Sequence, residues 1–249
     1  MPVRTQINDQ TTMGRPIIGV LMDYQKSSDF SQRPHYALRC SYFDAVWAAG
    51  GLPVALPYLT DAIDAFLARC DGLILPGGFY PFPAEIYGET PFIVETPHPR
   101  YIFERNLAIN ALKQNVPTLG ICAGMQIMAS VVGATLYRDV QKELPTEIDH
   151  LNKKPAEELA HGVSISTGTQ LHKLLGRESL QVNTAHKEAL KSCPNSITIN
   201  AQAEDGVVEG IEFPGHRFYL GVQWHPEFFA IKKDPNLKLF TALIEACEI

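Results

Sequence analysis

Short apolar runs alternate with segments of helical spacing through the first half of the chain. Unbroken apolar runs predict strands that are buried on both faces, as strands of a parallel sheet are. The runs are RPIIGVLM from Arg15, LPVALP from Leu52, DGLILPGG from Asp71 and PTLGI from Pro117. Residues 36–49, 60–70, 100–115 and 123–133 have helical spacing, with Thr60 as a suitable N-cap. The alternation predicts an α/β fold with a mostly parallel central sheet and helices on both faces.

The second half of the chain has a different pattern. Residues 138–162 are polar and irregular, and the runs HGVSIS, LQVNTA, SITINAQAE, GVVEGIEF and HRFYLGVQW predict short added strands. A last helix is expected from about Asn236 to Cys247. No linker-like break divides the chain, so we expect one domain over 15–249, preceded by a flexible polar tail over 1–14. Residues 79–99 are rich in proline and aromatic residues, which indicates a functional loop, either a lid or a rigid wall.

Composition excludes several classes of protein. The formal net charge is −6 and Lys and Arg are not clustered, so we expect no nucleic-acid partner. No apolar run approaches the ~20 residues that span a bilayer, and the N-terminus lacks the apolar stretch of a signal peptide. Five cysteines are scattered with no close pair, which indicates a reducing cytoplasm and neither disulfides nor a zinc site.

The segment GICAG places Cys122 between a predicted strand and a predicted helix. It fits the G-x-C-x-G form of a nucleophile elbow, in which glycines relieve crowding at a tight corner. The helix N-terminus favours the thiolate, and the N–H of Ala123 could donate to an oxyanion. Taken alone, the pattern fits a small buried cysteine in a turn equally well.

A cysteine nucleophile needs a base, and His225 has the best setting among the eight histidines. In YLGVQWHPEFF an apolar strand leads into His225, and Glu227 follows two residues later, on the same side if the chain stays extended. The carboxylate would orient the imidazole and favour its charged form. For HPE alone, a solvated strand end is the better interpretation.

The Cys122 motif and the His225 motif together indicate an active site, because both follow predicted parallel strands and such sheets collect active groups at the carboxyl ends of their strands. A third strand end, LILPGG, adds Gly77 and Gly78, where a backbone N–H can approach a substrate as the second oxyanion donor. An ordinary tight turn would have the same sequence pattern. The acid follows the histidine, whereas an α/β-hydrolase has its acid before the histidine.

The chain resembles the class I glutamine amidotransferase-like superfamily, which has a flavodoxin-like fold. The matching motifs are LPGG, LGICAGMQIM and GVQWHPE, in this order. The resemblance extends to the γ-glutamyl hydrolase branch of this superfamily and covers nearly the whole chain after Arg15. Five further segments carry it: PGGFYPFPAEIYGE, ERNLAINALKQNVPTLGIC, GATLYRDV, VNTAHKEAL and EDGVVEGIE. That branch includes γ-glutamyl-γ-aminobutyrate hydrolases.

The resemblance implies a triad of Cys122, His225 and Glu227, with oxyanion donors at Ala123 and at the Gly77-Gly78 turn. It implies that four residues contact the substrate: Gln126, Asn183, Thr184 and His186. Without the resemblance, Gln126 would be interpreted as a polar residue in the first turn of a helix. His186 would fit an exposed surface loop as well as it fits a substrate pocket. The branch often has Arg, Asp and Asp where this chain has Ala123, Phe79 and Tyr101. These departures affect the leaving-group pocket, so the substrate is not carried over.

The expected chemistry is hydrolysis of a small γ-glutamyl amide through a thioester, with no cofactor and no metal, since no ligand set of suitable spacing is present. The expected partner is the small-molecule substrate, with a homodimer left open. Two alternatives remain: a glutaminase subunit that passes ammonia to a separate synthase, and a non-catalytic binding or regulatory protein of the same fold.

Overall fold

The computed structural model describes residues 14–90, 96–230 and 235–248. The expected flexible tail therefore lies almost wholly outside the described residues, as does part of the 79–99 loop. Among the described residues, no helix is both long enough and apolar enough to cross a bilayer.

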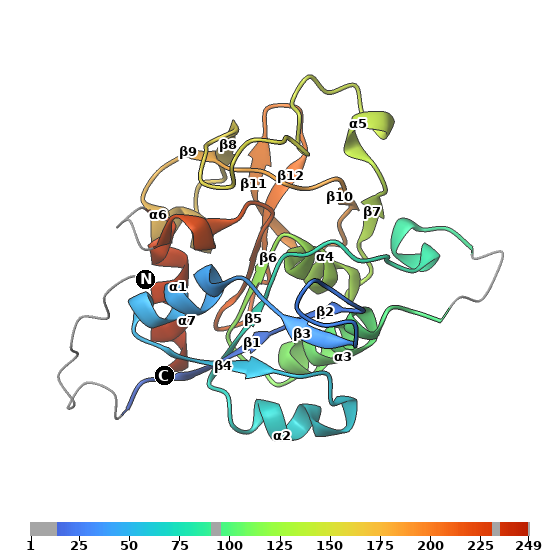
Figure 1. Cartoon of the computed structure of the whole chain (residues 1–249). Coiled ribbons are helices and arrows are strands. Elements are labelled where there is room, and N and C mark those ends of the chain that lie inside the picture. Colours follow the sequence, from blue (N-terminus) through green and yellow to red (C-terminus); the bar gives the residue numbers. More distant parts are fainter. Residues whose placement is uncertain (1–13, 91–95, 231–234, 249) are drawn as a thin grey trace.

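Strands and helices alternate up to β6, and strands predominate from β8 onward (Figure 1). The strands are β1 (Ile17–Leu21), β2 (Asp23–Gln25), β3 (His35–Ala37), β4 (Leu52–Leu56), β5 (Gly72–Leu75), β6 (Thr118–Ile121), β7 (Thr135–Tyr137), β8 (His161–Ile165), β9 (Ser179–Val182), β10 (Ala189–Ser192), β11 (Thr198–Ala203), β12 (Val208–Glu212) and β13 (Tyr219–Val222). The α-helices are α1 (Cys40–Ala49), α2 (Ile63–Leu67), α3 (Pro99–Lys113), α4 (Ala123–Ser130), α5 (Val140–Glu143), α6 (Gln170–Leu175) and α7 (Leu237–Cys247). The 3-10 helices are η2 (Thr60–Ala62), η3 (Ala84–Tyr87) and η4 (Pro226–Phe228).

Within the described ranges, nine strands form one mixed sheet in the order β4-β1-β5-β6-β13-β12-β11-β8-β9. The first five strands in this order are parallel to one another, and β12, β11, β8 and β9 continue the sheet with antiparallel pairing. The parallel part has the 2-1-3-4-5 order of flavodoxin-like sheets. The expected α/β fold, with strands added by the second half of the chain, is confirmed.

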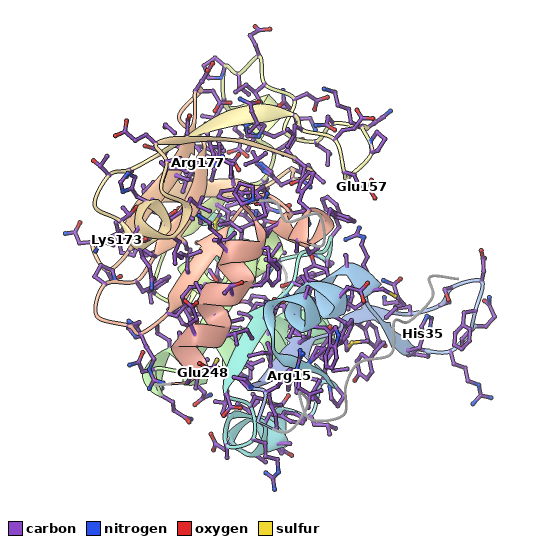
Figure 2. The ribbon with its side chains drawn as sticks, turned by 90° about the vertical axis from the view of Figure 1, so that its left-hand side faces the viewer. Arg15, His35, Glu157, Lys173, Arg177 and Glu248 are labelled. Carbon is purple, nitrogen blue, oxygen red and sulfur yellow. The ribbon has the colours of Figure 1, made fainter. Side chains whose placement is uncertain are left out.

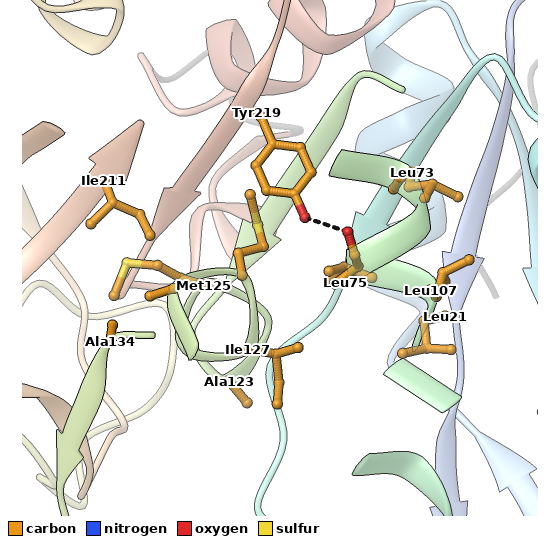
Figure 3. Packing of buried hydrophobic residues seen from close by; sticks show 14 of the residues in the cluster. Leu21, Leu73, Leu75, Leu107, Ala123, Met125, Ile127, Ala134, Ile211 and Tyr219 are labelled. Carbon is orange, nitrogen blue, oxygen red and sulfur yellow. Dashed lines mark hydrogen bonds between the residues drawn. The ribbon is translucent and has the colours of Figure 1, made fainter. Parts of the chain in front are cut away.

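Helices cover both faces of the sheet, with α1 and α7 on one side and α3 and α4 on the other (Figure 1). The side chains of β5 show why: Leu73 and Leu75 belong to one buried cluster, and Ile74 between them belongs to the other. Figure 3 shows the first cluster, in which Met125 and Ile127 of α4 are enclosed by side chains from the sheet and α3. The dashed line marks the hydrogen bond from the Tyr219 hydroxyl to the carbonyl of Ala108.

Local differences from the expected elements have simple causes. Thr60 does not cap a helix with its side chain, because it is itself the first residue of the 3-10 turn η2 that leads into α2. The helix expected over 36–49 begins only at Cys40, because His35–Ala37 pairs with β2. This two-stranded ribbon carries His35 away from the main body, on the side opposite Lys173 and Arg177 (Figure 2).

Candidate active site

Three neighbouring parallel strands end beside one another at the candidate site. Strand β6 pairs with β5 on one side and with β13 on the other, and Thr118 is level with both Leu73 and Tyr219. Gly77 and Gly78 follow β5, Cys122 follows β6 and His225 follows β13. The sheet therefore brings these motifs to one edge, as the strand pattern predicts.

Cys122 occupies a strained corner between β6 and α4. Its backbone has φ 52° and ψ −110°, a left-handed conformation that costs a non-glycine residue about 1–3 kcal/mol. The corner is held by a hydrogen bond of 2.8 Å from the Cys122 N–H to the carbonyl of Val222. Such strain is typical of a nucleophile that must project from a strand-to-helix turn.

Both glycines of GICAG are required by crowding. A Cβ on Gly124 would lie 1.9 Å from the carbonyl oxygen of Leu75, and a Cβ on Gly120 would lie 2.8 Å from the Met125 nitrogen and 2.3 Å from the Met128 sulfur. Since Leu75 O and Met125 N are backbone atoms, a rotamer change could not make room. The glycines let α4 lie directly against β5 and β6.

His225 and Glu227 form a buried pair. The Nδ1 of His225 lies 2.8 Å from Oε1 of Glu227, and the two residues are 5% and 1% exposed. The predicted contact exists, but its predicted geometry is wrong. The chain is not extended here, because β13 ends at Val222 and Pro226 begins the 3-10 turn η4, which curls Glu227 back onto the imidazole.

The third member, Cys122, lies close to the same imidazole. Burial lowers the pKa of His225, but the charges of Glu227 and Cys122 and a hydrogen bond with each of them outweigh it and raise the pKa to about 10. Gly77 packs against both groups, since a Cβ there would lie 2.5 Å from Cε1 of His225 and 3.2 Å from Cβ of Cys122. The structure thus brings together sulfur, imidazole, carboxylate and glycine turn.

Arg100 of α3 fixes the orientation of the glycine turn. Its guanidinium is fully buried and donates to the carbonyl oxygens of Pro76 and Gly77. The N–H of a trans peptide points opposite to its C=O, so the N–H groups of Gly77 and Gly78 are turned away from Arg100. Glu104, 2.9 Å from Arg100 Nε and itself buried, balances the charge.

The two glycine amides differ in their partners. The N–H of Gly77 donates to the Tyr42 hydroxyl over 2.9 Å, whereas no hydrogen bond of the Gly78 N–H is found within the described ranges. Ala123 is the first residue of α4, so its N–H has no acceptor within the helix. Of the predicted oxyanion donors, Ala123 and Gly78 are thus the better placed, and Gly77 would have to exchange its bond to Tyr42.

Tyr42 and Arg100 were not found by sequence reasoning. Tyr42 is fully buried, and its pKa is raised by burial and then by the charges of Glu227 and Cys122 beside it. It lies in a helix stripe that reads as ordinary core. In the sequence, Arg100 is one of several charged residues in its helix, so nothing distinguishes it from a surface residue.

Asn183 holds His225 rather than facing solvent. Its Oδ1 accepts from the His225 N–H at 2.9 Å, and its Nδ2 donates to the His225 carbonyl at 3.1 Å and to the carbonyl of Ala156. These bonds engage both polar atoms of the side-chain amide, so Asn183 positions the backbone of His225, and the second lone pair of its Oδ1 is the group left for a substrate contact.

Replacing Asn183 with alanine is therefore expected to lower kcat by about 10- to 100-fold with a smaller change in KM, because the imidazole loses its alignment. Steady-state kinetics on the preferred substrate measure this. Lys187→Ala, an exposed change in the same loop, is the control and should leave kcat unchanged. Equal kinetics for Asn183→Ala and the native chain would contradict the positioning role.

The other three predicted substrate residues also have protein partners. Gln126 donates through Nε2 to the carbonyl of Glu188 and to Gln223, which leaves its Oε1 as the group able to meet a substrate amine. Thr184 donates to the carbonyl of His150. His186 contacts Glu209, in a buried group with His150 and His161 that could hold a metal ion.

The first part of the 79–99 loop is a wall. Tyr80, Phe82, Ile86 and Tyr87 are buried, and the Tyr80 hydroxyl donates to Glu104 over 2.7 Å. Phe79, next to the glycine turn, is 62% exposed. Residues 91–95 lie outside the described residues, so the lid alternative is untested there.

Known proteins are similar to this chain over most of its length. A family model described as Peptidase C26 matches residues 16–227. A glutamine amidotransferase-like protein of Rickettsia prowazekii, whose name is itself provisional, is 33% identical over 93% of this chain and 98% of its own. The γ-glutamyl-γ-aminobutyrate hydrolase PuuD of Escherichia coli is 29% identical over 96% of each chain.

Solved structures share the fold. The glutaminase domain of a Trypanosoma brucei CTPS, solved with bound acivicin, superimposes with a TM-score of 0.61 at 20% identity over 92% of this chain and 94% of that one. A glutamine amidotransferase of Methylobacillus flagellatus superimposes with a TM-score of 0.55 at 16% identity, over 86% of this chain and 70% of that one. At this identity the likeness establishes the fold alone.

Proposed function

Since the chain belongs to the Peptidase C26 family, we propose that it hydrolyses the γ-glutamyl amide bond of a small γ-glutamyl compound through a thioester on Cys122. A hydrolase or amidotransferase-like activity on such amides follows from the family and its relatives. One observation supports the finer proposal above the others: Cys122 and Glu227 flank the same buried imidazole of His225.

The contacts support a specific division of labour. The Cys122 thiolate attacks the γ-carbonyl carbon, forming a C–S bond, and the carbonyl oxygen becomes an oxyanion facing the N–H groups of Ala123 and the glycine turn. His225 gives its proton to the leaving amine as the C–N bond breaks. Water, deprotonated by His225, then attacks the thioester, which releases glutamate and restores the thiolate–imidazolium pair. Glu227 keeps the imidazole in place throughout.

The identity of the leaving amine is the open part of the proposal. The resemblance implies acidic residues at the positions of Phe79 and Tyr101, and Phe79 is exposed beside the glycine turn. We therefore infer a leaving-group side that accepts apolar amines as well as γ-aminobutyrate.

A screen of γ-glutamyl compounds tests the function. Purified protein is incubated with γ-glutamyl-γ-aminobutyrate, γ-glutamyl derivatives of apolar amines, and glutamine, and glutamate release is measured. We expect at least one γ-glutamyl amine to be cleaved faster than glutamine, with equal amounts of amine and glutamate. Cleavage of glutamine alone would favour a glutaminase subunit. No glutamate from any compound, by protein that is folded by circular dichroism, would leave a binding or regulatory role.

The raised pKa of His225 predicts the basic limb of the pH profile. His225 must carry a proton to give to the leaving amine, so kcat/KM should hold through neutral pH and fall as pH rises through about 10. In Glu227→Gln the residual activity should fall at lower pH, because removing the carboxylate charge lowers the pKa of the imidazole. An NMR titration of the imidazole checks both proteins independently of the substrate. Titration of His225 near neutrality in the native chain would contradict this account.

A further inference from the structure

A second cluster of polar groups lies outside the candidate active site. His150, His161, His186 and Glu209 are all buried, at 0%, 8%, 1% and 0% exposure. Each offers one ligand atom, and the four atoms lie within 4.8 Å of one another. They come from the loop after α5, the start of β8, the β9–β10 loop and β12, which gather at the end of the molecule where α5 and β8 lie in Figure 1.

The spacing around Glu209 suits a metal ion. Its Oε1 lies 3.4 Å from His150 Nδ1, 3.5 Å from His161 Nε2 and 3.3 Å from His186 Nε2. A tetrahedral ion with nitrogen and oxygen ligands at about 2.0–2.1 Å separates neighbouring ligands by roughly 3.3–3.4 Å. The three distances from Glu209 therefore match the edges of such a tetrahedron, and the ligand atoms, which lie within 4.8 Å of one another, would draw together around the ion.

The outer nitrogen of each histidine has an acceptor. His161 Nδ1 lies 3.2 Å from the carbonyl of Gly162, and His186 Nδ1 lies 3.0 Å from the carbonyl of Glu188. His150 Nε2 lies 2.9 Å from Asp205. Since a carbonyl oxygen can only accept, the outer nitrogens carry the hydrogens. With the outer nitrogens held in this way, the inner nitrogens face Glu209, which is the arrangement that orients metal-binding histidines.

Without a cation this arrangement is costly. His150 Nδ1, His161 Nε2 and Glu209 Oε2 are buried with no hydrogen-bond partner among the residues that the structure describes. Protonated rings could donate to Glu209 and Asp205, but three buried positive charges, with ring centres 4.8 and 5.0 Å apart, would then face only these two carboxylates. One divalent cation bound by Oε1 of Glu209 would satisfy the inner nitrogens of all three histidines at once.

We propose that His150, His161, His186 and Glu209 bind one Zn²⁺ ion. Imidazole and carboxylate ligands without thiolate suit zinc and other divalent transition metals rather than calcium or magnesium. Four protein ligands fill a tetrahedral ion completely, so the site is structural, with no open position for catalysis. The expectation of no metal, which rested on sequence spacing, is replaced by this proposal, because the ligands come from four separate segments.

The ion would stabilise the loop that carries the active-site support. Thr184 Oγ1 and the His186 N–H both donate to the carbonyl of His150, at 2.7 and 2.9 Å, so the His150 loop and the β9–β10 loop already lie against each other. Asn183, which holds His225, lies at the start of the same loop. An ion that binds these segments only in the folded chain stabilises the native state and resists local opening of the loop.

Metal content is the first test. Full-length protein is purified without chelators, supplemented with ZnCl₂ and desalted, and zinc is measured by inductively coupled plasma mass spectrometry. We expect about one zinc per chain. After stripping with dipicolinate, returning ZnCl₂ should raise Tm by about 5 °C or more. The matched variant is Glu209→Gln, which keeps shape but loses a charged ligand, and the control is His172→Asn, which removes a histidine of α6 outside the cluster.

Glu209→Gln should bind Zn²⁺ at least about 10-fold more weakly and lose most of the Tm response, whereas His172→Asn should behave as the native chain. If Glu209→Gln does not fold, Co²⁺ added to stripped native protein decides, since tetrahedral Co²⁺ gives intense visible bands and Zn²⁺ should displace them. Zinc far below one equivalent with no Tm shift, or equal binding by Glu209→Gln, would overturn the proposal in favour of a metal-free cluster. Both readouts are independent of hydrolase activity.

Discussion

Replacing Cys122 with alanine is expected to lower glutamate release from the preferred γ-glutamyl substrate by at least about 10³-fold. The thiolate is the atom that bonds to the γ-carbon, and the thioester path has no substitute for it. Neither His225 nor the amides of the corner can supply that bond. Parallel kinetics on the native and Cys122→Ala proteins measure the effect.

The loss should not come from unfolding. Alanine keeps the Cβ at the strained corner, and only a small, nearly buried sulfur is removed, so Tm should change by about 3 °C or less. The control is Cys193→Ala, since burial raises the pKa of that thiol and keeps it protonated. Cys193→Ala should retain full activity. Undiminished turnover by Cys122→Ala would assign the nucleophile elsewhere.

Replacing Gly124 with alanine is expected to destabilise the fold by more than about 3 kcal/mol or to prevent folding. The added Cβ would lie 1.9 Å from the carbonyl oxygen of Leu75, and neither β5 nor the start of α4 can move without opening the sheet edge that carries Cys122. Urea denaturation followed by circular dichroism gives the free energy of unfolding.

Gly162→Ala is the matched control for this prediction. Its added Cβ would approach only the side chain of Gln181, with Nε2 at 2.9 Å, which is the far end of a flexible side chain. The change should cost less than about 1 kcal/mol. Equal losses for the two variants would show that the corner does not depend on close packing of α4 against β5.

The central sheet and the meeting of Cys122 with His225 could be predicted from the sequence. Each parallel strand is an uninterrupted apolar run, and a parallel sheet has one carboxyl edge, so motifs that follow strands must converge. The glycines of GICAG also indicated a tight corner in the sequence. The structure gives the reason, because a Cβ at either position would lie within 3 Å of backbone atoms, so no other residue fits.

Other parts depend on contacts that no local pattern encodes. Arg100 acts on carbonyls of Pro76 and Gly77 that lie far from it in sequence, and Tyr42 reaches Gly77 from another helix. In the sequence, both look like ordinary helix residues with no sign of a functional role. The turn at Pro226 was missed because a short strand continuation and a 3-10 turn place residues His225 and Glu227 together equally well.

The loop VNTAHKEAL makes contacts that the resemblance does not imply. Substrate contact by this loop stays a prediction, whereas the structure shows Asn183 bonded to the backbone of His225 and His186 beside Glu209. The histidine cluster itself gave no signal, because its members stand in four segments with no metal-binding spacing between neighbours.

Covalent labelling of the active protein tests the central claim most directly. A glutamate analogue with a chloromethyl ketone at the γ-position should alkylate the nucleophile, and peptide mass spectrometry locates the label. The account predicts one label per chain, on Cys122, with loss of activity in proportion to labelling and protection by a γ-glutamyl substrate. Inactivation with Cys122 unmodified, or with the label on another residue, would contradict it.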